Sequence, residues 1–276
     1  MTNHIAFLGT GSMNEAIMAG LLAAGFPKSD VTATVRRGER AAELAQRYGV
    51  TAMATAEDDD VNAQAVRGAS VVVLGVKPVG IADVAREIAS ALRPDAIVVS
   101  VAAAVSIAQL EKALPAGQPV VRTMPNTPAR LGHGVVSVSG GTNASRDQVE
   151  RVVKLFKSVG LVVEVPEDQV EAVGALSGSG PAYVFYLAEA MAKAGEALGL
   201  DPYLALKLAR ETVVGAAHML AEPGADPVAL RRAVTSPKGT TERAIAVFEE
   251  RGLPAIIADG ARAAAERSRE ITRELD

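Results

Sequence analysis

The chain has 276 residues, 49% of them hydrophobic, and carries a formal net charge of −4 at pH 7. A chain of this length and apolar content can bury a sizeable core, and two domains suit it better than one. The negative charge and the 3% aromatic content argue against nucleic-acid binding, and the absence of cysteine excludes disulfides and thiolate metal sites.

Neither a metal site nor a membrane segment is expected. The three histidines, at positions 4, 133 and 218, are scattered, so they do not suggest a ligand set. No apolar run approaches the length of about 18 residues that a membrane span needs, and no basic-then-apolar leader opens the sequence. We therefore expect a soluble, cytoplasmic protein that acts on small molecules.

The first motif is an apolar segment that leads into two glycines. Ile5–Leu8 is long enough for one buried strand, Gly9 and Gly11 follow, and an apolar periodic segment begins at Met13. The first glycine allows a sharp turn, and the second lets an anion approach the N–H groups at the helix start, which includes Ser12. The pattern predicts a dinucleotide-binding turn, although a plain strand-to-helix turn can carry the same glycines.

The end of the second strand indicates which dinucleotide is bound. Val31–Val35 contains alternating β-branched residues, and Arg36 and Arg37 follow it, with no acid before Glu39. At this position of a dinucleotide-binding fold an acid binds a ribose 2′-hydroxyl, whereas arginine suits a 2′-phosphate. The arginines therefore favour NADPH over NADH, unless they only begin a solvated helix.

Strands and helices alternate through the first half of the chain. Further strands are predicted at 71–76, 96–100 and 120–124, with helices at 39–48, 79–92 and 107–114. The acidic segment 51–60 is predicted to be a surface loop, and Asn62 is placed to cap the helix that follows it.

This alternation predicts a mostly parallel α/β sheet with helices on both faces. Ligands of such a sheet bind beyond the carboxyl ends of the strands, so residues that directly follow the strands share one rim. The candidate cofactor-binding residues on this rim are Gly9, Gly11, Ser12, Met13, Arg36, Arg37, Val76, Lys77, Pro78, Ala102, Pro125 and Asn126.

The second half of the chain changes character. Strands at 135–138 and 161–165 enclose a helix at 148–158, and from 171 onward only helices are predicted. We therefore expect a cofactor domain at 1–165 and a helical domain at 166–276. Helices at 181–200 and 204–220 have so little polar surface that we expect a second copy of the chain to cover them, rather than a single buried helix.

A loop rich in hydroxyl groups precedes one of the later helices. Ser236, Gly239, Thr240 and Thr241 surround the predicted helix start at Glu242, where N–H groups and hydroxyls can hold a carboxylate. The alternative is that Thr240 or Thr241 serves only as a helix cap. We find no serine–histidine–aspartate set, carboxylate pair or metal cluster that would favour a hydrolase.

Five segments together resemble the pyrroline-5-carboxylate reductase family, in order and at matching separations. They are the glycine turn followed by Met13, the triplet Val76-Lys77-Pro78, and the segments 124–128 (Met-Pro-Asn-Thr-Pro), 176–183 (Leu-Ser-Gly-Ser-Gly-Pro-Ala-Tyr) and 234–241 (Val-Thr-Ser-Pro-Lys-Gly-Thr-Thr). The resemblance implies a Rossmann-type N-terminal domain and an all-α C-terminal domain that interlocks with a partner in a homodimer, often assembled into a decamer.

The resemblance also implies an activity, which is the reduction of Δ1-pyrroline-5-carboxylate to L-proline by NADPH or NADH, the last step of proline biosynthesis. It places Asn62 at the cofactor ribose. Ser236, Gly239, Thr240 and Thr241 would hold the substrate carboxylate, and the Thr241 hydroxyl would reach the ring nitrogen as the catalytic contact.

Three residues depart from the family pattern. Lys238 and Ala104 stand where the family usually has glycine, and Asn14 replaces alanine in the glycine fingerprint. Asn14 would oppose close packing of the first helix on its strand, and Lys238 would alter the backbone of the hydroxyl-rich loop. We expect activity to survive all three changes.

No catalytic dyad is needed for this chemistry, since a protonated imine accepts hydride once two rings are held face to face. Two other hypotheses remain open at this point. A related β-hydroxyacid dehydrogenase or imine reductase would use a lysine or aspartate of the helical half, but Lys193 and Lys207 lie on polar stripes. The chain could also be a non-catalytic NADP-binding dimer.

Overall fold

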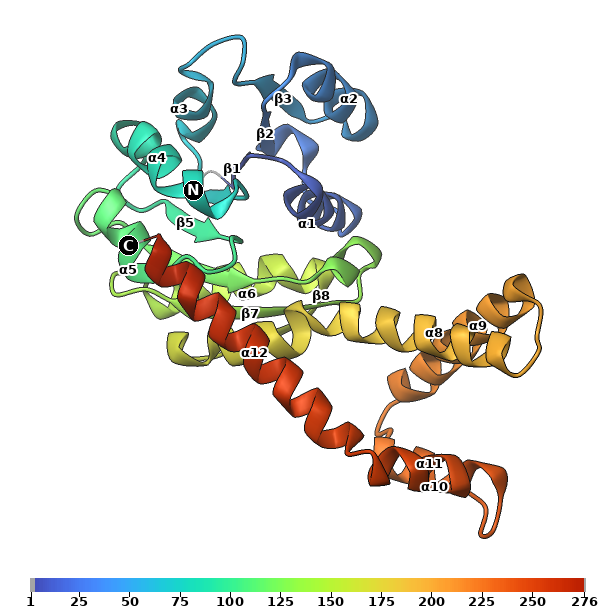
Figure 1. Cartoon of the computed structure of the whole chain (residues 1–276). Coiled ribbons are helices and arrows are strands. Elements are labelled where there is room, and N and C mark those ends of the chain that lie inside the picture. Colours follow the sequence, from blue (N-terminus) through green and yellow to red (C-terminus); the bar gives the residue numbers. More distant parts are fainter. Residues whose placement is uncertain (1–2, 276) are drawn as a thin grey trace. The chain divides into compact units, whose positions relative to one another are not determined.

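The strands, which all lie between residues 5 and 164, form a single sheet in the computed structural model, which describes residues 3–275 (Figure 1). The sheet has eight strands in the order β3-β2-β1-β4-β5-β6-β7-β8. The strands are β1 (Ile5–Leu8), β2 (Val31–Val35), β3 (Thr51–Ala54), β4 (Val71–Leu74), β5 (Ile97–Ser100), β6 (Val120–Met124), β7 (Gly134–Gly140) and β8 (Gly160–Glu164).

The six strands from β3 to β6 are parallel, so their carboxyl ends lie at one edge of the sheet. β7 is antiparallel to β6, and β8 is parallel to β7. The chain passes from β1 outward to β2 and β3 and then returns to β4 on the other side of β1. This reversal between β1 and β4 is the point at which open α/β sheets bind their ligands.

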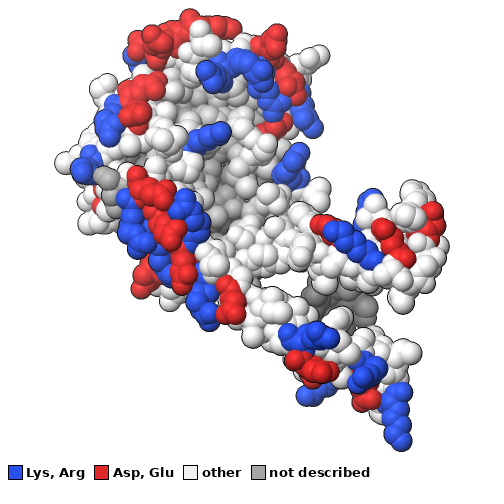
Figure 2. All heavy atoms as spheres, viewed as in Figure 1, with Lys and Arg blue, Asp and Glu red and all other residues white. Residues whose placement is uncertain are grey.

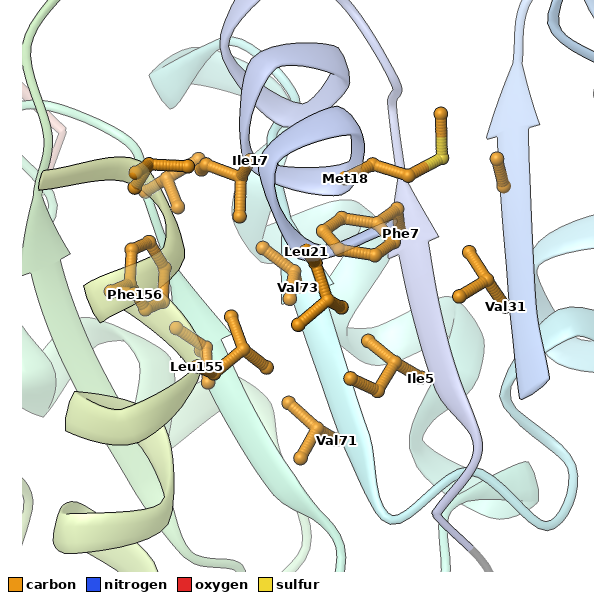
Figure 3. Packing of buried hydrophobic residues seen from close by; sticks show 14 of the residues in the cluster. Ile5, Phe7, Ile17, Met18, Leu21, Val31, Val71, Val73, Leu155 and Phe156 are labelled. Atoms are coloured by element: carbon orange, nitrogen blue, oxygen red, sulfur yellow. The ribbon is translucent and has the colours of Figure 1, made fainter. Parts of the chain in front are cut away.

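Helices cover both faces of the sheet because successive strand residues point to opposite sides. On β1, Ile5 and Phe7 belong to one buried cluster, with α1, α2 and α6, whereas Ala6 and Leu8 belong to the other, with α3, α4 and α5 (Figure 3). The helices are α1 (Ser12–Ala23), α2 (Gly38–Tyr48), α3 (Val61–Val66), α4 (Pro78–Ile88), α5 (Ile107–Ala113) and α6 (Arg146–Phe156).

Local sequence signals set most of these boundaries. Gly49 ends α2 in the left-handed conformation, with φ +69°, as a glycine cap does. Ser106 and Ser145 each form a capping box with the glutamine three residues later, at the starts of α5 and α6. The strand order and the parallel pairing of β3 to β6 confirm the predicted, mostly parallel α/β class and its central strands.

Two local predictions are wrong. Thr51–Ala54 is the edge strand β3, because its register against β2 supplies backbone hydrogen bonds that the acidic residues after it do not disturb. Asn62 does not cap α3: Asp60 is the capping residue, with no side-chain bond, and Asn62 lies in the first turn with its side chain buried.

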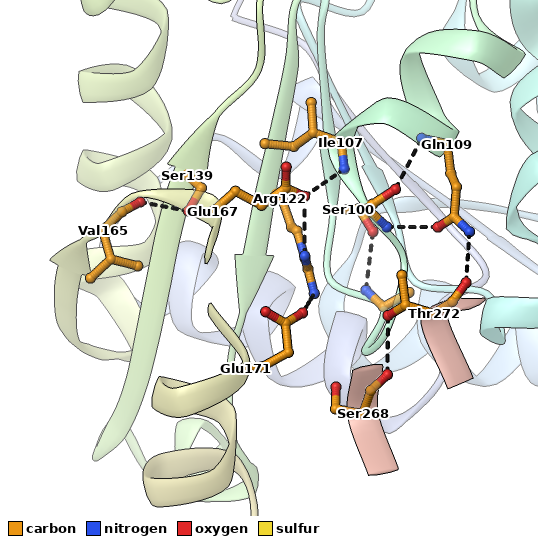
Figure 4. A network of polar contacts seen from close by, with 12 residues as sticks. Ser100, Ile107, Gln109, Arg122, Ser139, Val165, Glu167, Glu171, Ser268 and Thr272 are labelled. Carbon is orange, nitrogen blue, oxygen red and sulfur yellow. Dashed lines mark hydrogen bonds and ion pairs between the residues drawn. The ribbon is translucent and has the colours of Figure 1, made fainter. Parts of the chain in front are cut away.

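The chain divides into two compact units, residues 179–263 and the rest, a division that differs from the predicted boundary near 165. The segment after β8 stays with the sheet because buried Arg122 of β6 donates to Glu167 at 3.1 Å and to Glu171 at 2.8 Å (Figure 4). Glu167 also accepts the N–H of Ile107 at 2.7 Å. This segment includes α7 (Val170–Val173) and a π-helical turn (Gly174–Gly178).

The end of the chain also belongs to the sheet unit. Residues from 264 onward form the last part of α12 (Leu253–Glu274). The Gln109 side chain of α5 donates to the Thr272 carbonyl at 3.1 Å, and Leu275 packs on the cluster beneath α4 and α5 (Figure 4). The C-terminal turns of α12 therefore stabilise the sheet unit, although the sequence pattern assigns them to the helical domain.

The second unit is entirely helical. It contains α8 (Gly180–Ala197), α9 (Pro202–Ala221), α10 (Pro227–Ala233) and α11 (Thr240–Glu250), together with the start of α12. α8 and α9 pack closely at Gly195, where an added Cβ would lie 3.0 Å from the Ala205 Cβ. Among the described residues, no helix is long and apolar enough to cross a membrane.

Much of the apolar surface of α8 and α9 is exposed within one chain. Phe185 and Tyr186 are 68% and 72% exposed, and Tyr203 is 77% exposed. The first half of α8 has no charged side chain, and the space-filling view shows uncharged surface there (Figure 2). Such a surface is typical of an interface with another protein.

We expect Arg122→Met to destabilise the sheet unit by about 3 kcal/mol, because it leaves the nearly buried Glu171 carboxylate without its partner. Arg146→Met is the matched control, since the Arg146 side chain is 64% exposed and solvent screens its pairs with Glu150 and Glu164, so the loss should be much smaller. Denaturant unfolding of both variants measures the difference. Equal losses would show that the buried network adds nothing specific.

Candidate functional site

The two glycines after β1 have different roles. Gly9 has φ +69°, and a Cβ on it would lie 2.5 Å from the Val76 Cγ1 and 3.0 Å from the Val76 backbone nitrogen. Gly9 therefore allows the turn after β1 to touch the turn after β4. A Cβ on Gly11 would meet nothing within 4 Å, so the space over that peptide is open.

The free backbone donors of this turn lie at the start of α1. Gly9 and Thr10 donate to the side-chain and backbone oxygens of Thr34, at 3.3 and 2.7 Å, and Gly11 donates to the Gly9 carbonyl. Gly11 is the N-cap, and no side chain caps the helix. The N–H groups of Ser12 and Met13 thus have no acceptor within residues 3–275, and free N–H groups at the positive end of a helix favour an anion.

The departure of Asn14 from the glycine fingerprint suggested that it would oppose close packing of α1 on its strand. The structure shows that it does not. Its buried amide donates to the Leu8 carbonyl at 3.0 Å and to the Val73 carbonyl at 3.3 Å, which links the ends of β1 and β4. Gly75 makes room for it, because a Cβ there would lie 2.3 Å from the Asn14 Nδ2. The small residue that allows close packing is therefore directly after β4 rather than on α1.

Helix α2 is joined to the first turn of α1 by a polar cluster. Glu15 accepts hydrogen bonds from Arg40 and from the Tyr48 hydroxyl, the latter at 3.0 Å. Burial, reinforced by the bond to the Glu15 carboxylate, raises the pKa of Tyr48 above its usual value. The cluster therefore holds α1 and α2, which precede and follow β2 in the chain, against each other.

Most of the predicted cofactor-binding residues follow the ends of neighbouring parallel strands. Arg36 and Arg37 are exposed directly after β2, with no ion pair to any described residue, and Arg37 is the N-cap of α2. Lys77 is exposed after β4, and Pro78 is the first residue of α4. Ala102 is buried after β5. The sheet thus brings the predicted rim together, because these strands are parallel.

Asn126 and Asn62 have side chains that are already engaged. The Asn126 amide donates to the Ser177 carbonyl at 2.8 Å, and its oxygen accepts from Val135 at 2.9 Å, so it holds the turn beginning at buried Pro125 against later segments. The Asn62 oxygen accepts from the Thr34 hydroxyl at 2.7 Å, and its nitrogen donates to Glu87 of α4 at 3.3 Å.

The hydroxyl-rich loop begins a helix without a side-chain cap. α11 starts at Thr240, two residues earlier than predicted, and its N-cap is Gly239, which forms no capping bond. The hydroxyls of Ser236, Thr240 and Thr241 have no hydrogen-bond partner in the described part of the chain. The alternative that one of these threonines is only a cap is therefore wrong, and the helix N-terminus remains available to an anion.

The other two departures from the family pattern share one backbone feature. Within the described chain, Ala104, with φ +59°, and Lys238, with φ +60°, are the non-glycine residues with positive φ. Glycine adopts this conformation without strain, which explains the family preference. At Lys238, the N–H donates to the Glu242 carboxylate at 2.7 Å, which holds the strained residue in place.

Sequence reasoning missed Thr34 and Gly75. Thr34 looks like an ordinary β-branched strand residue, and its hydroxyl acquires a role only because β1 and α3 lie beside β2. Gly75 adjoins the recognised triplet, but its contact with Asn14 joins residues 61 positions apart in the sequence. No periodicity or spacing signals such a contact.

Two family models match the chain. One, described as pyrroline-5-carboxylate reductase dimerisation, matches residues 167–271, and one described as NADP oxidoreductase coenzyme F420-dependent matches residues 4–104. The first match begins close to the domain boundary predicted near 165, whereas the compact units divide later, after residue 178.

Similar proteins cover the chain from end to end. A pyrroline-5-carboxylate reductase of Pseudomonas aeruginosa is 40% identical over 275 residues, which is 99% of this chain and 98% of the relative. A solved structure of a pyrroline-5-carboxylate reductase from Coxiella burnetii has a TM-score of 0.90 at 37% identity and covers 98% of this chain and 99% of its own. The Plasmodium falciparum pyrroline carboxylate reductase with NADP bound shares the fold, with a TM-score of 0.83 at 24% identity and 99% coverage of both chains.

We expect Gly75→Ala to destabilise the protein by about 1–3 kcal/mol, because the new methyl group would overlap the Asn14 amide. In an Asn14→Ala background the same change should cost clearly less, since the amide is gone. Gly80→Ala is the matched control: Gly80 lies within α4 with open space around it, so alanine there should be neutral or stabilising. Unfolding measurements on the double-mutant cycle check the coupling, and strictly additive losses would contradict it.

Proposed function

The chain belongs to the pyrroline-5-carboxylate reductase family, and on that premise we propose how its residues carry the reaction. It reduces Δ1-pyrroline-5-carboxylate to proline with a nicotinamide dinucleotide, which supplies the hydride when bound. The observation that carries this assignment is the 40% identity over 99% of the chain. The sequence-derived resemblance is thus confirmed, and neither of the two other hypotheses gains support from these matches.

The glycine turn is our proposed binding site for the cofactor diphosphate. The open space over Gly11 and the free N–H groups of Ser12 and Met13 fit a bulky anion, which the helix dipole also favours. Gly9 shapes the turn rather than donating to the ligand. Asn62 is proposed to meet the ribose with its amide.

The rest of the rim is proposed to line the nicotinamide half of the cofactor. Val76, Lys77 and Pro78 follow β4, next to the glycine turn. Ala102 follows β5, and the Pro125-Asn126 turn follows β6. Since the Asn126 side chain is engaged with Ser177 and Val135, its backbone rather than its amide is the group available to the cofactor.

Arg36 and Arg37 are proposed to make NADPH the preferred cofactor, with NADH still usable. Both side chains are exposed after β2, and neither forms an ion pair with a described residue, so both can approach a phosphate. Two guanidinium groups provide the planar donors that suit phosphate oxygens. NADH lacks the 2′-phosphate, so it would lose only these contacts and would keep the others that NADPH makes.

The loop before α11 is proposed to bind the substrate. The uncapped helix start at Gly239 and Thr240, with the Ser236 hydroxyl beside it in the sequence, can hold a carboxylate without a buried cation. Thr241 is proposed to donate a hydrogen bond from its hydroxyl to the ring nitrogen. Negative charge would develop on that nitrogen during hydride transfer unless it is already protonated, so a donor there stabilises the transition state.

We also propose that the helical unit forms a homodimer, which can assemble further into a decamer. The match to a dimerisation model over 167–271 and the exposed apolar side chains of α8 and α9, including Phe185, Tyr186 and Tyr203, support the dimer.

Lys193 pairs with Glu189 on the polar side of α8 and is 70% exposed, which does not suggest a catalytic lysine.

Thr241→Ala should lower kcat/KM for pyrroline-5-carboxylate by roughly tenfold to a thousandfold, the range for loss of one oriented donor. Thr241→Ser keeps the hydroxyl and should retain most of the activity. Thr142→Ala, which removes an exposed hydroxyl bonded to Glu111, serves as a control and should change nothing. Steady-state oxidation of NADPH measures all three, and an unchanged Thr241→Ala enzyme would reject the proposed donor.

The double variant Arg36→Ala, Arg37→Ala should raise the KM for NADPH at least about tenfold more than the KM for NADH, as expected when charged contacts to one phosphate are lost. Arg67→Ala is the matched control, because Arg67 is an exposed arginine between α3 and the amino end of β4. The same oxidation assay with each cofactor gives the ratio. Equal losses for both cofactors would remove the case for a 2′-phosphate contact.

A further inference from the structure

One buried hydroxyl connects three elements of the cofactor rim. Thr34 lies within β2 and is 0% exposed. Its Oγ1 accepts a hydrogen bond from the Gly9 N–H at 3.3 Å and donates to the Asn62 Oδ1 at 2.7 Å. The glycine turn after β1 and the first turn of α3 are therefore linked through a single side chain of β2.

The Glu87 carboxylate sets the direction of these bonds. A carboxylate only accepts, so the Asn62 nitrogen faces Glu87 and the amide oxygen faces Thr34, whose hydroxyl proton it accepts, while the Gly9 N–H donates to the same Thr34 oxygen. A hydroxyl proton requires the carbonyl oxygen of the Asn62 amide, which turns the NH2 group to the opposite side. That nitrogen donates one proton to Glu87 at 3.3 Å and keeps a second for another acceptor.

We propose that Thr34 is a positioning residue for the nicotinamide dinucleotide. It fixes the Asn62 amide so that the second N–H can meet a sugar hydroxyl oxygen, and it holds the Gly9 peptide in the turn that receives the diphosphate. This inference rests on the proposed cofactor role of Asn62 and adds the residue that orients it. An amide and a turn held in place before binding lose less freedom when the ligand arrives, which favours affinity.

The decisive variant is Thr34→Val, which keeps the β-branched shape but removes the hydroxyl. It leaves the Gly9 N–H and the Asn62 oxygen without partners in a buried setting. The Kd for NADPH and for NADH should each rise about five- to thirtyfold, as expected for loss of a buried hydrogen bond, since both cofactors share the diphosphate and the 3′-hydroxyl of the adenine ribose. At saturating cofactor, kcat should stay within about twofold, because the reacting groups are unchanged.

Two further variants separate positioning from general stability. Thr34→Ser restores the hydroxyl and should return both Kd values to within about twofold of the wild type. Thr32→Val makes the same replacement at a buried threonine two residues earlier on β2, whose hydroxyl bonds neither to Gly9 nor to Asn62 in the described residues. It should leave both Kd values unchanged.

Binding is measured by calorimetry or by quenching of reduced-cofactor fluorescence, without the second substrate. Wild-type affinity in Thr34→Val, equal losses in Thr34→Val and Thr32→Val, or failure of serine to restore binding would each overturn the proposal. In an Asn62→Ala background Thr34→Val should have a smaller effect, and an undiminished effect would also overturn it. A wild-type enzyme that bound cofactor but did not reduce pyrroline-5-carboxylate would instead contradict the proposed function.

Discussion

The close approach of the ends of β1 and β4 determines the form of the proposed cofactor site. At this point of the sheet the chain reverses its direction of winding, and two turns come within van der Waals contact at Gly9 and Val76. A side chain at Gly9 would force them apart. The Asn14 amide then joins the two strand ends, which is possible because Gly75 leaves space for it. Close backbone packing, rather than any charged side chain, shapes the proposed anion site.

Some backbone N–H groups of the glycine turn form hydrogen bonds within the protein, and others remain free for a ligand. Gly9, Thr10 and Gly11 use their N–H groups within the protein, whereas Ser12 and Met13 keep theirs free. The first group fixes the shape of the turn, and the second is the group that we propose to bind anions. A diphosphate bound there would therefore meet donors that are already in place, which lowers the ordering cost of binding.

The proposed substrate loop uses the same physical device in the other compact unit. α11, like α1, begins after a glycine N-cap without a side-chain bond, so its first N–H groups are unsatisfied by the protein. A cofactor diphosphate and a substrate carboxylate are both anions, and helix starts suit both. The positive φ of Lys238, held by Glu242, shows that the loop tolerates backbone strain to keep this shape.

The sequence by itself determined seven of the eight strands, their mostly parallel class and the rim on which Arg36, Lys77 and Pro125 lie, because apolar runs and glycines impose structure on the residues next to them in the chain. It also determined the family, since five segments occur in order at matching separations. Only the tertiary structure decided that β3 is a strand, that Asn62 turns toward Thr34 rather than capping α3, and that the end of α12 packs with the sheet. These features depend on partners distant in the sequence, such as Gly75 for Asn14 and Gln109 for Thr272, and such contacts exist only after the chain has folded.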